Sequence, residues 1–490
     1  MSIVVIGAGP AGCAAARLLA SWGHDVTVLA RRASPDRALG ESLPPSCVTL
    51  LDHIGITGES LDAAGFLRST GNTVRWGAGD ERVEQFAEGL HGYQVDRAAF
   101  DAFLVQNAKA AGAEVRLGVG VTAVRRDSDT TVVFEQGGIS ERLPARWVLD
   151  CTGRSGLIAR DGLRQPESAA RTTAIVGVWE RDDDWPTPQP SHTVVESTED
   201  GWAWSVPVSR KRRYVTLMVD PTITPVASRE GLERAYLEQL ARTRSQSTLV
   251  AGARRVGPVF ARDASPYTAR TFGEVGTLLV GDAASFVDPL SSFGVKKALA
   301  SAWMASVVVH SILLNGASAA PALELFNTRE RAMYEALRGS AAALARDAAD
   351  AHPTAFWEAR AAATDADIAF EPDVAALRND ADVTSAFEEL RRRDTIRLRP
   401  TALVKRASRP TVRGNRVVVE DHLIVPAFPA GVRYVRNIDL VRLSDLASSH
   451  DQVPDLFAAY NSVASPAPLP DFLGALSLLI GKGFLEWESA

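Results

Sequence analysis

The sequence has few cysteines and no apolar run long enough to cross a membrane. Its 490 residues include only three cysteines, too few for a disulfide framework and not spaced as a zinc site: Cys13, Cys47 and Cys151. We therefore expect no metal site and a reducing, cytoplasmic setting. Beyond the N-terminus, the longest apolar stretch, residues 298–314, is interrupted by His310 and is shorter than the roughly 20 residues that span a bilayer. No membrane anchor is expected.

The chain also lacks a large excess of charge of either sign. Its 53 basic and 59 acidic residues give a net charge of -6, which argues against binding along the phosphate backbone of a nucleic acid. Hydrophobic residues make up 46% and charged residues 23%, the proportions of a globular protein, so most of the chain should fold. The length predicts about three domains or one large composite enzyme.

The N-terminus has the pattern of a strand, a helix and a second strand. Residues 2–6 form a β-branched run, residues 10–22 are predicted to be helical, and residues 25–29 form the second strand. The turn after the first strand carries the spacing GxGxxG: Gly7, Gly9 and Gly12. There the first glycine makes a tight turn, the second lets the backbone approach a pyrophosphate, and the third lets helix and strand pack closely. Because helix N-termini favour phosphates, this unit predicts a dinucleotide site.

One part of this dinucleotide fingerprint is missing. The acidic residue that usually ends the second strand and binds the adenosine ribose is replaced by Ala30. Two explanations stay open: either Arg31 or Arg32 holds the ribose, or adenosine recognition is looser than usual.

Two later segments indicate which dinucleotide is bound. Strand-like residues 277–280 run into Gly281 and Asp282, and the pair Asp288 and Pro289 precedes a predicted helix. At this point the chain resembles the FAD-dependent monooxygenases of the p-hydroxybenzoate hydroxylase fold, and more closely their flavin-dependent halogenase-like branch. Further matches to the family's motifs lie at Asp96, Arg97, Asp150, Gly153 and Gly156.

The resemblance implies that FAD is the cofactor. It implies that Asp282 hydrogen-bonds the ribityl chain and that Pro289 and the helix-opening turn lie beside the isoalloxazine, where the helix dipole favours negative charge. The residues expected to bind FAD, with Arg31 added for the missing acid, are Gly7, Gly9, Gly12, Arg31, Glu41, Ser42, Arg97, Asp282, Pro289, Ser292, Phe293, Gly294 and Val295.

These patterns and the resemblance predict an α/β fold. It consists of a GxGxxG Rossmann-like FAD-binding domain with an interleaved antiparallel β-sheet substrate lobe, a helical linker and a small C-terminal α/β module. The expected limits are 1–345 for the FAD-binding body, about 172–265 for the inserted lobe, 346–395 for the linker and 396–490 for the module. The module resembles a winged-helix or peptide-binding type.

Two motifs are similar to the halogenase-like branch in particular, and two positions depart from it. Glu41 lies in a GExxxP segment, and the expected substrate pocket consists of Trp202, Trp204 and Pro207 of a WxWxxP motif together with Ser69. The bland alternative is that the two tryptophans only pack on one face of a strand. Halogenases of this type carry a catalytic lysine in an FxxKxG setting, where this chain has Ser69, and tryptophan-type enzymes carry a glutamate where it has Ser291. Serine has no ionisable nitrogen with which to present a halogen electrophile.

The missing lysine favours a monooxygenase. We expect hydroxylation of an electron-rich aromatic substrate, phenolic or indolic, free or bound to a peptide or carrier, through a flavin C4a-hydroperoxide. Electrons would come from NAD(P)H or a partner flavin reductase. Three alternatives stay open: a halogenase with relocated catalytic groups, a flavin-dependent alkene reductase, and a non-catalytic flavin-bound peptide-binding scaffold. The absence of a CxxC pair disfavours a flavin-disulfide reductase.

No catalytic base stands out from the sequence. Weak candidates are His192, Glu196 and Asp220 from the second lobe and Lys296 at the start of the flavin-side helix. For the first three, a solvated strand or turn residue is the favoured interpretation.

The entrance to the C-terminal module is basic. Residues 391–416 contain ten basic side chains and one acidic one. This run either docks an acidic carrier or leader peptide or is simply a solvated surface on a module that caps the body, and we favour the second reading slightly.

Overall fold

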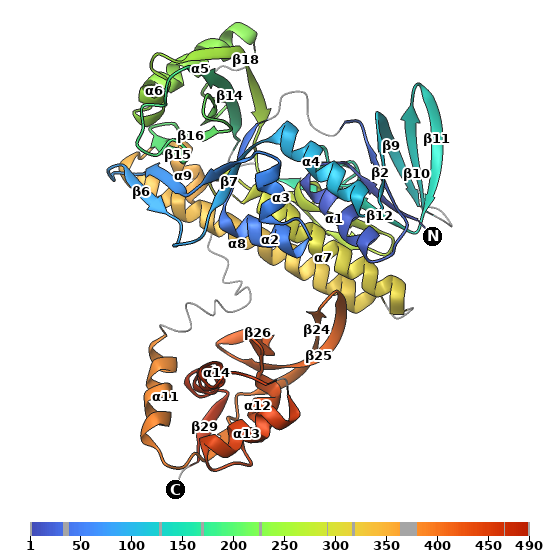
Figure 1. The fold of residues 1–490 in the computed structure, drawn as a ribbon, viewed down its shortest axis with the longest axis vertical. Helices are drawn as coiled ribbons and strands as arrows, with labels where there is room; N and C mark the ends of the chain where they lie inside the picture. Colours follow the sequence, from blue (N-terminus) through green and yellow to red (C-terminus); the bar gives the residue numbers. More distant parts are fainter. Residues whose placement is uncertain are drawn as a thin grey trace. The chain divides into compact units, whose positions relative to one another are not determined.

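The computed structural model describes most of the chain. The described residues are 2–32, 39–126, 130–167, 171–224, 228–291, 293–315, 319–362, 380–464 and 466–488. The chain divides into two compact units, Met1–Ala366, here called the body, and Asp367–Ala490, the C-terminal unit. Figure 1 labels many of the elements of each unit.

The boundary between the two units differs from the limits expected at 345 and 395. Helices α8 (Ala320–Ala351) and α9 (Ala355–Ala361) pack on each other in the body, whereas α11 (Ala381–Arg392) packs on α14 (Leu469–Gly481) in the C-terminal unit. Their apolar side chains are buried in different cores. The segment expected to be a helical linker is therefore shared between the two units.

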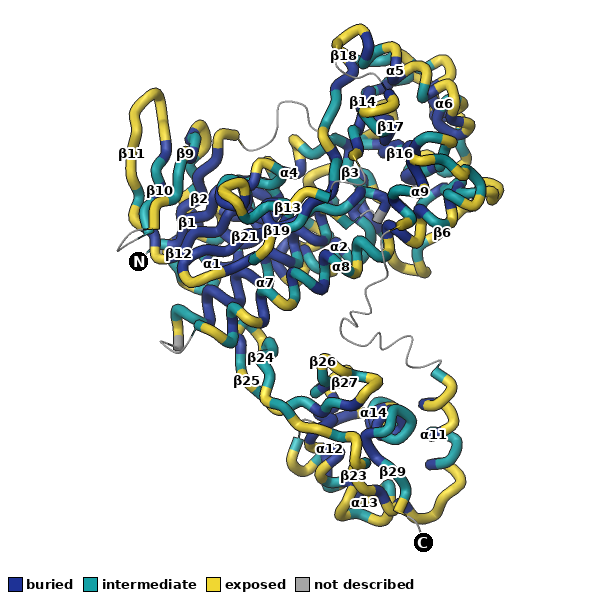
Figure 2. Tube along the Cα trace, turned by 180° about the vertical axis from the view of Figure 1, so that it is seen from behind, coloured by how far each residue is buried: buried dark blue, intermediate teal, exposed yellow. Residues whose placement is uncertain are grey.

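A six-stranded, largely parallel sheet forms the centre of the body. Its order is β20-β21-β12-β1-β2-β8, and only β20 pairs antiparallel. The strands are β1 (Ile3–Ile6), β2 (Val26–Ala30), β8 (Glu114–Leu117), β12 (Trp147–Asp150), β20 (Gly273–Glu274) and β21 (Thr277–Leu279). Helix α1 (Pro10–Ser21) packs against α4 (Arg97–Ala110) and α7 (Gly294–Asn315). The predicted strand-helix-strand start is confirmed, and burial of the inner strands explains their uninterrupted apolar sequence (Figure 2).

A seven-stranded sheet forms the second lobe of the body. Its order is β18-β14-β17-β16-β15-β5-β6, with one parallel pair, β15 and β5. The strands are β5 (Gly71–Arg75), β6 (Arg82–Gln85), β14 (Thr173–Glu180), β15 (Thr193–Thr198), β16 (Gly201–Pro207), β17 (Arg212–Val219) and β18 (Arg254–Asp263). The predicted antiparallel lobe is present, and the structure adds β5 and β6 from outside its expected limits.

The two faces of the lobe sheet have different covers. Alternating side chains such as Ile175 and Leu217 pack against α5 (Arg229–Arg242) and α6 (Ser245–Val250). On the other face an aromatic cluster packs against α8 and α9. That second face also contacts Leu290, next to Pro289, and so it is the face turned toward the expected flavin site.

Smaller sheets carry several of the motif residues. One has the order β3-β7-β4 and contains the GExxxP and Ser69 segments. These strands are β3 (Gly40–Leu43), β4 (Leu67–Ser69) and β7 (Gly92–Asp96). Helices α2 (Pro45–His53) and α3 (Gly58–Ala63) lie between β3 and β4 in the chain. The others are the β9-β10-β11 and β13-β19-β22 sheets. Their strands are β9 (Val119–Arg126), β10 (Thr130–Gln136), β11 (Ile139–Ala145), β13 (Arg164–Pro166), β19 (Tyr267–Ala269) and β22 (Ser285–Phe286).

The C-terminal unit has its own core of helices and short sheets. It contains the antiparallel sheet β24-β25-β26 and the pairs β23-β29 and β27-β28. Its other elements are β23 (Leu398–Pro400), β24 (Lys405–Arg413), β25 (Arg416–Val425), β26 (Phe428–Val432), β27 (Tyr434–Val435), β28 (Ile438–Asp439), α12 (Leu440–Ala447), α13 (Val453–Val463) and β29 (Leu485–Trp487). The predicted core face of the last helix is confirmed, since Phe472, Leu476 and Leu479 are fully buried.

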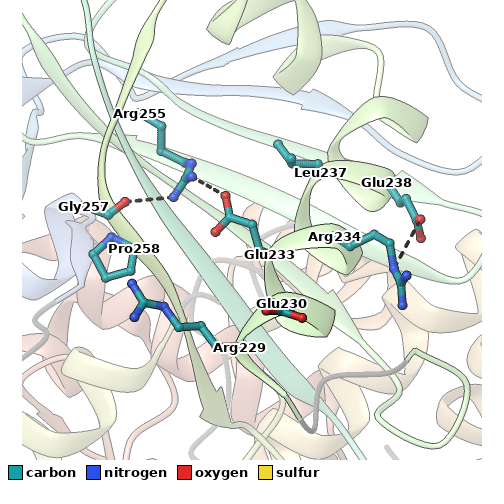
Figure 3. Close-up of a pocket in the computed structure, with 9 residues that line it drawn as sticks. All are labelled: Arg229, Glu230, Glu233, Arg234, Leu237, Glu238, Arg255, Gly257 and Pro258. Carbon is teal, nitrogen blue, oxygen red and sulfur yellow. Dashed lines mark hydrogen bonds and ion pairs between the residues drawn. The ribbon is translucent and has the colours of Figure 1, made fainter.

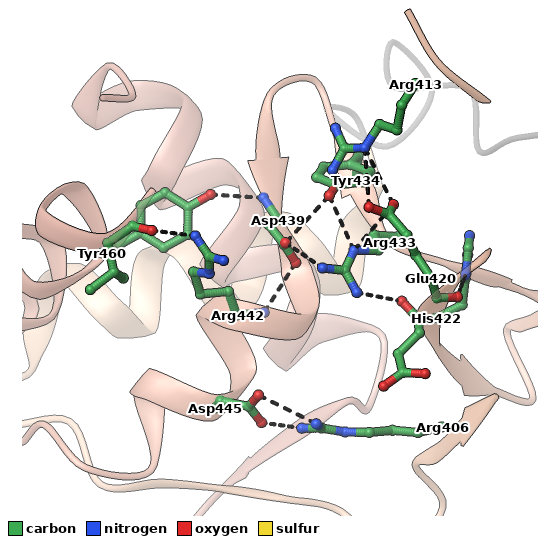
Figure 4. A network of polar contacts seen from close by, with 12 residues as sticks. Arg406, Arg413, Glu420, His422, Arg433, Tyr434, Asp439, Arg442, Asp445 and Tyr460 are labelled. Carbon is green, nitrogen blue, oxygen red and sulfur yellow. Dashed lines mark hydrogen bonds and ion pairs between the residues drawn. The ribbon is translucent and has the colours of Figure 1, made fainter. Parts of the chain in front are cut away.

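About half of the basic run at the start of the C-terminal unit is neutralised within that unit. Five of its ten basic side chains form ion pairs with nearby acidic ones: Arg391, Arg393, Arg399, Arg406 and Arg413. Figure 4 shows two of these pairs beside a network centred on Arg433 and Asp439. The local excess of charge seen in the sequence is therefore smaller in the folded unit.

Among the described residues, one helix is long and apolar enough to cross a membrane by length and composition. It is the Gly294–Leu314 stretch of α7, and 72% of the most apolar part is buried inside the protein.

Candidate flavin and substrate site

Three motif turns lie side by side at one edge of the central sheet. The parallel register pairs Ile6 with Asp150 and Asp150 with Leu279, so β1, β12 and β21 end together. The turns that follow begin at Gly7, Cys151 and Val280. Because ligands of open α/β sheets bind outside the carboxyl ends of the strands, this edge is where a dinucleotide is expected.

The three glycines of the first turn have different surroundings. A Cβ on Gly7 would lie 2.4 Å from the Cys151 carbonyl oxygen, and one on Gly12 would lie 1.9 Å from the Gly7 carbonyl oxygen. A Cβ on Gly9 meets nothing within 4 Å, and the same is true of Gly294 at the start of α7. Two glycines thus allow close backbone packing while Gly9 faces open space, which is the arrangement that a pyrophosphate requires. The residues present fit FAD.

The second turn is held by a buried carboxylate. Asp150 Oδ1 accepts hydrogen bonds from the backbone N–H and hydroxyl of Thr152, and Oδ2 accepts one from the Ile158 N–H at 2.7 Å. Burial raises the pKa of Asp150, and these donors act against that rise. Asp150 therefore fixes the backbone of its turn, and both of its oxygens are engaged by the protein.

The third turn presents Asp282 on a buried scaffold. Lys297 Nζ lies 3.4 Å from Asp282 Oδ1 and donates to the carbonyl oxygen of Gly281 at 3.1 Å. The Gly281 N–H donates to Ser301 Oγ, and the Tyr267 hydroxyl donates to the Asp282 carbonyl oxygen at 2.6 Å. The Lys297 side chain is 3% exposed, whereas that of Asp282 is 31% exposed. Asp282, the residue expected to bind the ribityl chain, is therefore anchored by buried neighbours, while its own side chain is partly accessible.

Glu41 and Arg97 form the ion pair that joins the GExxxP strand to α4. Arg97 Nη1 lies 3.0 Å from Glu41 Oε1, and Arg97 Nε lies 3.2 Å from Asp101 Oδ1. Burial raises the pKa of Asp101 to about 6, while Arg97 acts against that rise. Asp101 was not predicted as a site residue, although the (i, i+4) spacing from Arg97 could have indicated the pair.

The remaining expected FAD residues have varied environments. Arg31 is exposed at the end of β2, and its Nε would lie 3.6 Å from a Cβ on Gly120. Half-buried residues are Ser42, Pro289 and Phe293; Val295 is buried, and Gly294 is exposed. Ser292 lies outside the described residues. Direct contact of all of these residues with FAD stays a prediction.

The WxWxxP motif forms part of an aromatic wall on the flavin-side face of the lobe. Trp202 and Trp204 stack with ring centroids 4.7 Å apart, so they share one face of β16 as expected. The ring centroids of Trp202 and Trp76 are 6.4 Å apart, and those of Trp76 and Trp357 of α9 are 5.5 Å apart. Pro207 is buried farther along the strand. The sequence interpretation missed Trp76 and Trp357, which lie on segments far from the motif.

Ser69, which stands where the resembling halogenases have their catalytic lysine, is buried and hydrogen-bonded. Its side chain is 1% exposed, and its hydroxyl donates to the carbonyl oxygen of Gly71 at 3.1 Å. The neighbouring Arg68 pairs with Asp62, with 2.8 Å between Nε and Oδ1. Neither side chain offers a free amine.

The four candidate bases prove to be very different groups. His192 is fully buried between the hydroxyls of Thr70 and Thr73, at 3.1 and 3.3 Å, and burial lowers its pKa. Glu196 is 1% exposed. Its carboxylate accepts three backbone N–H bonds at the start of α6, from Arg244, Ser245 and Gln246. The interpretation of these two residues as solvated is therefore wrong, because partners distant in sequence bury them.

The other two candidates are more accessible. Asp220 accepts from the N–H and hydroxyl of Thr222 in a turn. Lys296 is half-buried, with Nζ 4.8 Å from the centre of the Phe293 ring. Lys296 is therefore a primary amine beside the expected flavin-side turn. Among the described residues, no group of three or more metal-binding side chains is present.

A separate hollow of about 890 Å³ lies between α5 and β18 (Figure 3). Its charged side chains neutralise one another, as in the pairs Arg255 with Glu233 and Arg234 with Glu238. None of the motif residues lines this hollow.

Comparison with known proteins agrees with this geometry. Residues 1–337 match the family model described as "FAD binding domain". The chain belongs to this family. FAD is therefore its cofactor, and its relatives are flavin-dependent halogenases and monooxygenases.

One curated relative and two solved structures illustrate the family. The tryptophan 2-halogenase of Chondromyces crocatus is 30% identical over 334 residues, which cover 66% of this chain and 64% of that protein. The flavin-dependent halogenase CmlS matches 100% of this chain and 96% of its own at a TM-score of 0.80 and 24% identity. QhpG, a peptidyl tryptophan dihydroxylase essential for tryptophylquinone cofactor biogenesis, matches 98% of this chain and 99% of its own, with a TM-score of 0.70 and 24% identity. Both solved structures show the fold.

Proposed function

We propose that this protein is an FAD-dependent monooxygenase that hydroxylates an electron-rich aromatic substrate, phenolic or indolic. The carrying observation is Ser69, which is buried and bonded to the Gly71 carbonyl oxygen at the position of the halogenase lysine. A hydroxyl there cannot form a haloamine or act as a cationic donor. When bound and reduced, FAD supplies an activated oxygen atom from dioxygen.

The protein's part is to exclude water, orient the ring and accept a proton. Trp204 is half-buried and offers part of its ring to a planar substrate, while Trp76 and Trp202, at 4% and 3% exposure, support it from the core. His192 is not the proton acceptor in this proposal, because its partner Thr73 lies beside Val194 on the α5 and α6 face of the lobe sheet, opposite the aromatic wall. A base within reach of the bound ring accepts the proton of a phenol or indole and so raises the nucleophilicity of the ring.

A substrate attached to a peptide or carrier is the finer part of the proposal. Its support is that QhpG, named as acting on peptidyl tryptophan, shares the fold over nearly the whole of both chains, including the region of the C-terminal unit. The charge of residues 391–416 gives less support, because half of its basic side chains are already paired.

The test uses the full chain with FAD, an NADH-driven flavin reductase and oxygen-18 dioxygen. Free tryptophan, free tyrosine and peptides that contain either residue are offered in parallel, and products are weighed by mass spectrometry. We expect a product heavier by one or more labelled oxygen atoms. Unlabelled product would contradict the proposal, and two-electron reduction of an alkene without oxygen would select the reductase alternative. Tight peptide binding that is unaffected by removal of FAD, without turnover, would select the scaffold.

A halogenase with relocated groups is the second candidate. Lys296 favours it, because this half-buried amine lies at the start of α7 beside Phe293, and the Chondromyces crocatus relative is named a tryptophan 2-halogenase. Chloride or bromide is added to the same assay. Halide-dependent product that is lost in Lys296→Met but kept in Lys405→Met, a change at an exposed lysine of the C-terminal unit, would establish this function. Its absence across the substrates would exclude it.

A further inference from the structure

A buried ion pair joins the flavin-side turn to α9. Asp288, the residue before Pro289, is 6% exposed, and Arg360 of α9 is 7% exposed. Arg360 Nε lies 3.6 Å from Asp288 Oδ2. The two residues are 72 positions apart, and Arg360 lies in the segment that the sequence suggested was a linker.

Arg360 holds three parts of the body together. Its Nη2 donates to the Arg171 carbonyl oxygen at 2.9 Å and to Thr172 Oγ1 at 2.6 Å, where the chain enters β14. Its Nη1 donates to the Phe356 carbonyl oxygen within α9, and its guanidinium lies 3.6 Å from the centre of the Phe356 ring. The planar fork of arginine allows these contacts while Nε faces Asp288.

Asp288 connects this arginine to the aromatic wall. Its Oδ1 accepts from the Leu290 N–H at 3.2 Å. Burial raises the pKa of Asp288, while Arg360, the Leu290 N–H and the Trp202 indole act against that rise. Asp288 Oδ2, Arg360 Nε and Trp202 Nε1 are buried and make no hydrogen bond of ordinary length. Buried polar atoms left in this state require an explanation, and strain held at a functional site is one.

We propose that Arg360 is a positioning residue for the flavin site. It sets the Asp288 carboxylate, which in turn sets the Asp288–Leu290 turn and the Trp202 indole next to Asp288. Arg360 thereby fixes the spacing between the flavin-side turn and the aromatic wall of the lobe. The role belongs to FAD binding, so it holds whether the enzyme hydroxylates or halogenates, and its failure is distinguishable from failure of the proposed function.

Charge removal separates this role from simple stabilisation. Removing one partner of a buried pair leaves an uncompensated charge and destabilises the fold, whereas removing both is often tolerated. Positioning, in contrast, is lost in all three variants, because the contact between Arg360 and the Asp288 carboxylate is missing from each of them. Stability and flavin environment should therefore respond differently to Arg360→Met, Asp288→Asn and the double variant.

The experiment measures two properties of each full-length variant. Thermal unfolding of the FAD-free protein reports stability, and FAD titration with visible circular dichroism reports the flavin environment. We expect both single variants to unfold about 5 to 10 °C earlier and the double variant to recover most of that loss. All three should bind FAD about tenfold more weakly, with an altered flavin dichroism.

The control is Arg338→Met, which removes an arginine paired with Glu335 on α8. It should leave FAD affinity and dichroism unchanged. Wild-type FAD affinity and dichroism in the double variant, or in both single variants, would overturn the proposal and leave Arg360 as a stabilising residue only. Should Arg360→Met fail to fold, Asp288→Asn and the double variant decide between the same two outcomes.

Discussion

The body and the C-terminal unit use charged side chains in opposite ways. In the body, Asp150, Glu196 and Lys297 are almost completely buried and are bonded mainly to backbone groups. In the C-terminal unit, many charged side chains are exposed and pair with each other, as in Arg406 with Asp445 at 44% and 52% exposure. Asp150 and Lys297 hold two of the three motif turns at the edge of the central sheet, whereas the surface pairs hold no motif turn.

The difference separates charges that shape a site from charges that only cover a surface. A buried charge is costly unless backbone donors or acceptors satisfy it, so it fixes the loops that satisfy it. An exposed pair contributes about 0 to 1 kcal/mol and fixes little. We therefore expect changes to the body's buried groups and tight turns to have large effects and changes to the surface pairs of the C-terminal unit to have small ones.

The largest effect is expected at Gly12. Its Cβ would lie 1.9 Å from the Gly7 carbonyl oxygen, so Gly12→Ala should prevent the first turn from closing and yield protein without FAD. Gly9→Ala is the matched control, because its Cβ meets nothing within 4 Å. That variant should unfold at the wild-type temperature without FAD and bind FAD about tenfold more weakly. FAD content and thermal unfolding are measured for both variants. Equal FAD content and equal unfolding temperature would contradict the different roles proposed for Gly12 and Gly9.

The next effect is expected at Glu196. Glu196→Ala leaves the backbone N–H groups of Arg244, Ser245 and Gln246 without their buried acceptor. The free energy of unfolding should fall by about 3 kcal/mol. Urea denaturation compares this variant with Glu238→Ala, which changes an exposed glutamate on α5. If Glu196→Ala lowers the free energy of unfolding no more than the control does, Glu196 does not stabilise the body through its buried backbone contacts.

The pH dependence of the body's stability should reflect the titration of the Glu330 carboxyl. Burial raises the pKa of this α8 carboxyl to about 7, although Lys297 acts against the rise. Because the folded pKa lies above the ordinary value of 4.5, the contribution to stability is fully present below pH 4.5 and is lost as the pH rises through about 7. Glu330→Gln should remove about 2 kcal/mol of this decline between pH 5 and 8, measured by urea denaturation. Glu324→Gln, on the exposed side of the same helix, should retain the wild-type slope.

The smallest effect is expected at Asp445. Asp445→Ala breaks its exposed pair with Arg406 and should cost less than about 1 kcal/mol. Asp439 sharpens the comparison inside the same unit, since it is 7% exposed, pairs with Arg433 at 2.7 Å and accepts from the Arg442 N–H. Asp439→Ala should cost about 3 kcal/mol. Denaturation curves in which Asp445→Ala costs as much as Asp439→Ala would break the proposed distinction.

Sequence patterns predicted the fold where local backbone demands are strict. Gly7, Gly9 and Gly12 each meet a requirement of their own turn, and buried parallel strands require continuous apolar runs. The two strands added to the lobe, β5 and β6, could not be assigned in this way. Their place depends on pairing β5 in parallel with β15, more than 100 residues away.

The candidate site was predicted only in part, because several of its contacts join segments that are distant in the sequence. The FAD motifs and the Ser69 departure were readable because each is local. The burial of His192 and Glu196 depends on Thr70 and on the start of α6, and neither is signalled near the two residues. Trp76 and Trp357 join the WxWxxP tryptophans only through folding.

The sequence by itself determined the cofactor class and the two-lobed α/β architecture, because turn geometry and strand burial are written in adjacent residues. Tertiary structure alone decided which charges are buried. It divided the expected linker between two units, neutralised half of the basic run and brought Arg360 to Asp288. The physical reason is that the cost of a buried charge and the partners that offset it depend on groups the chain brings together only on folding.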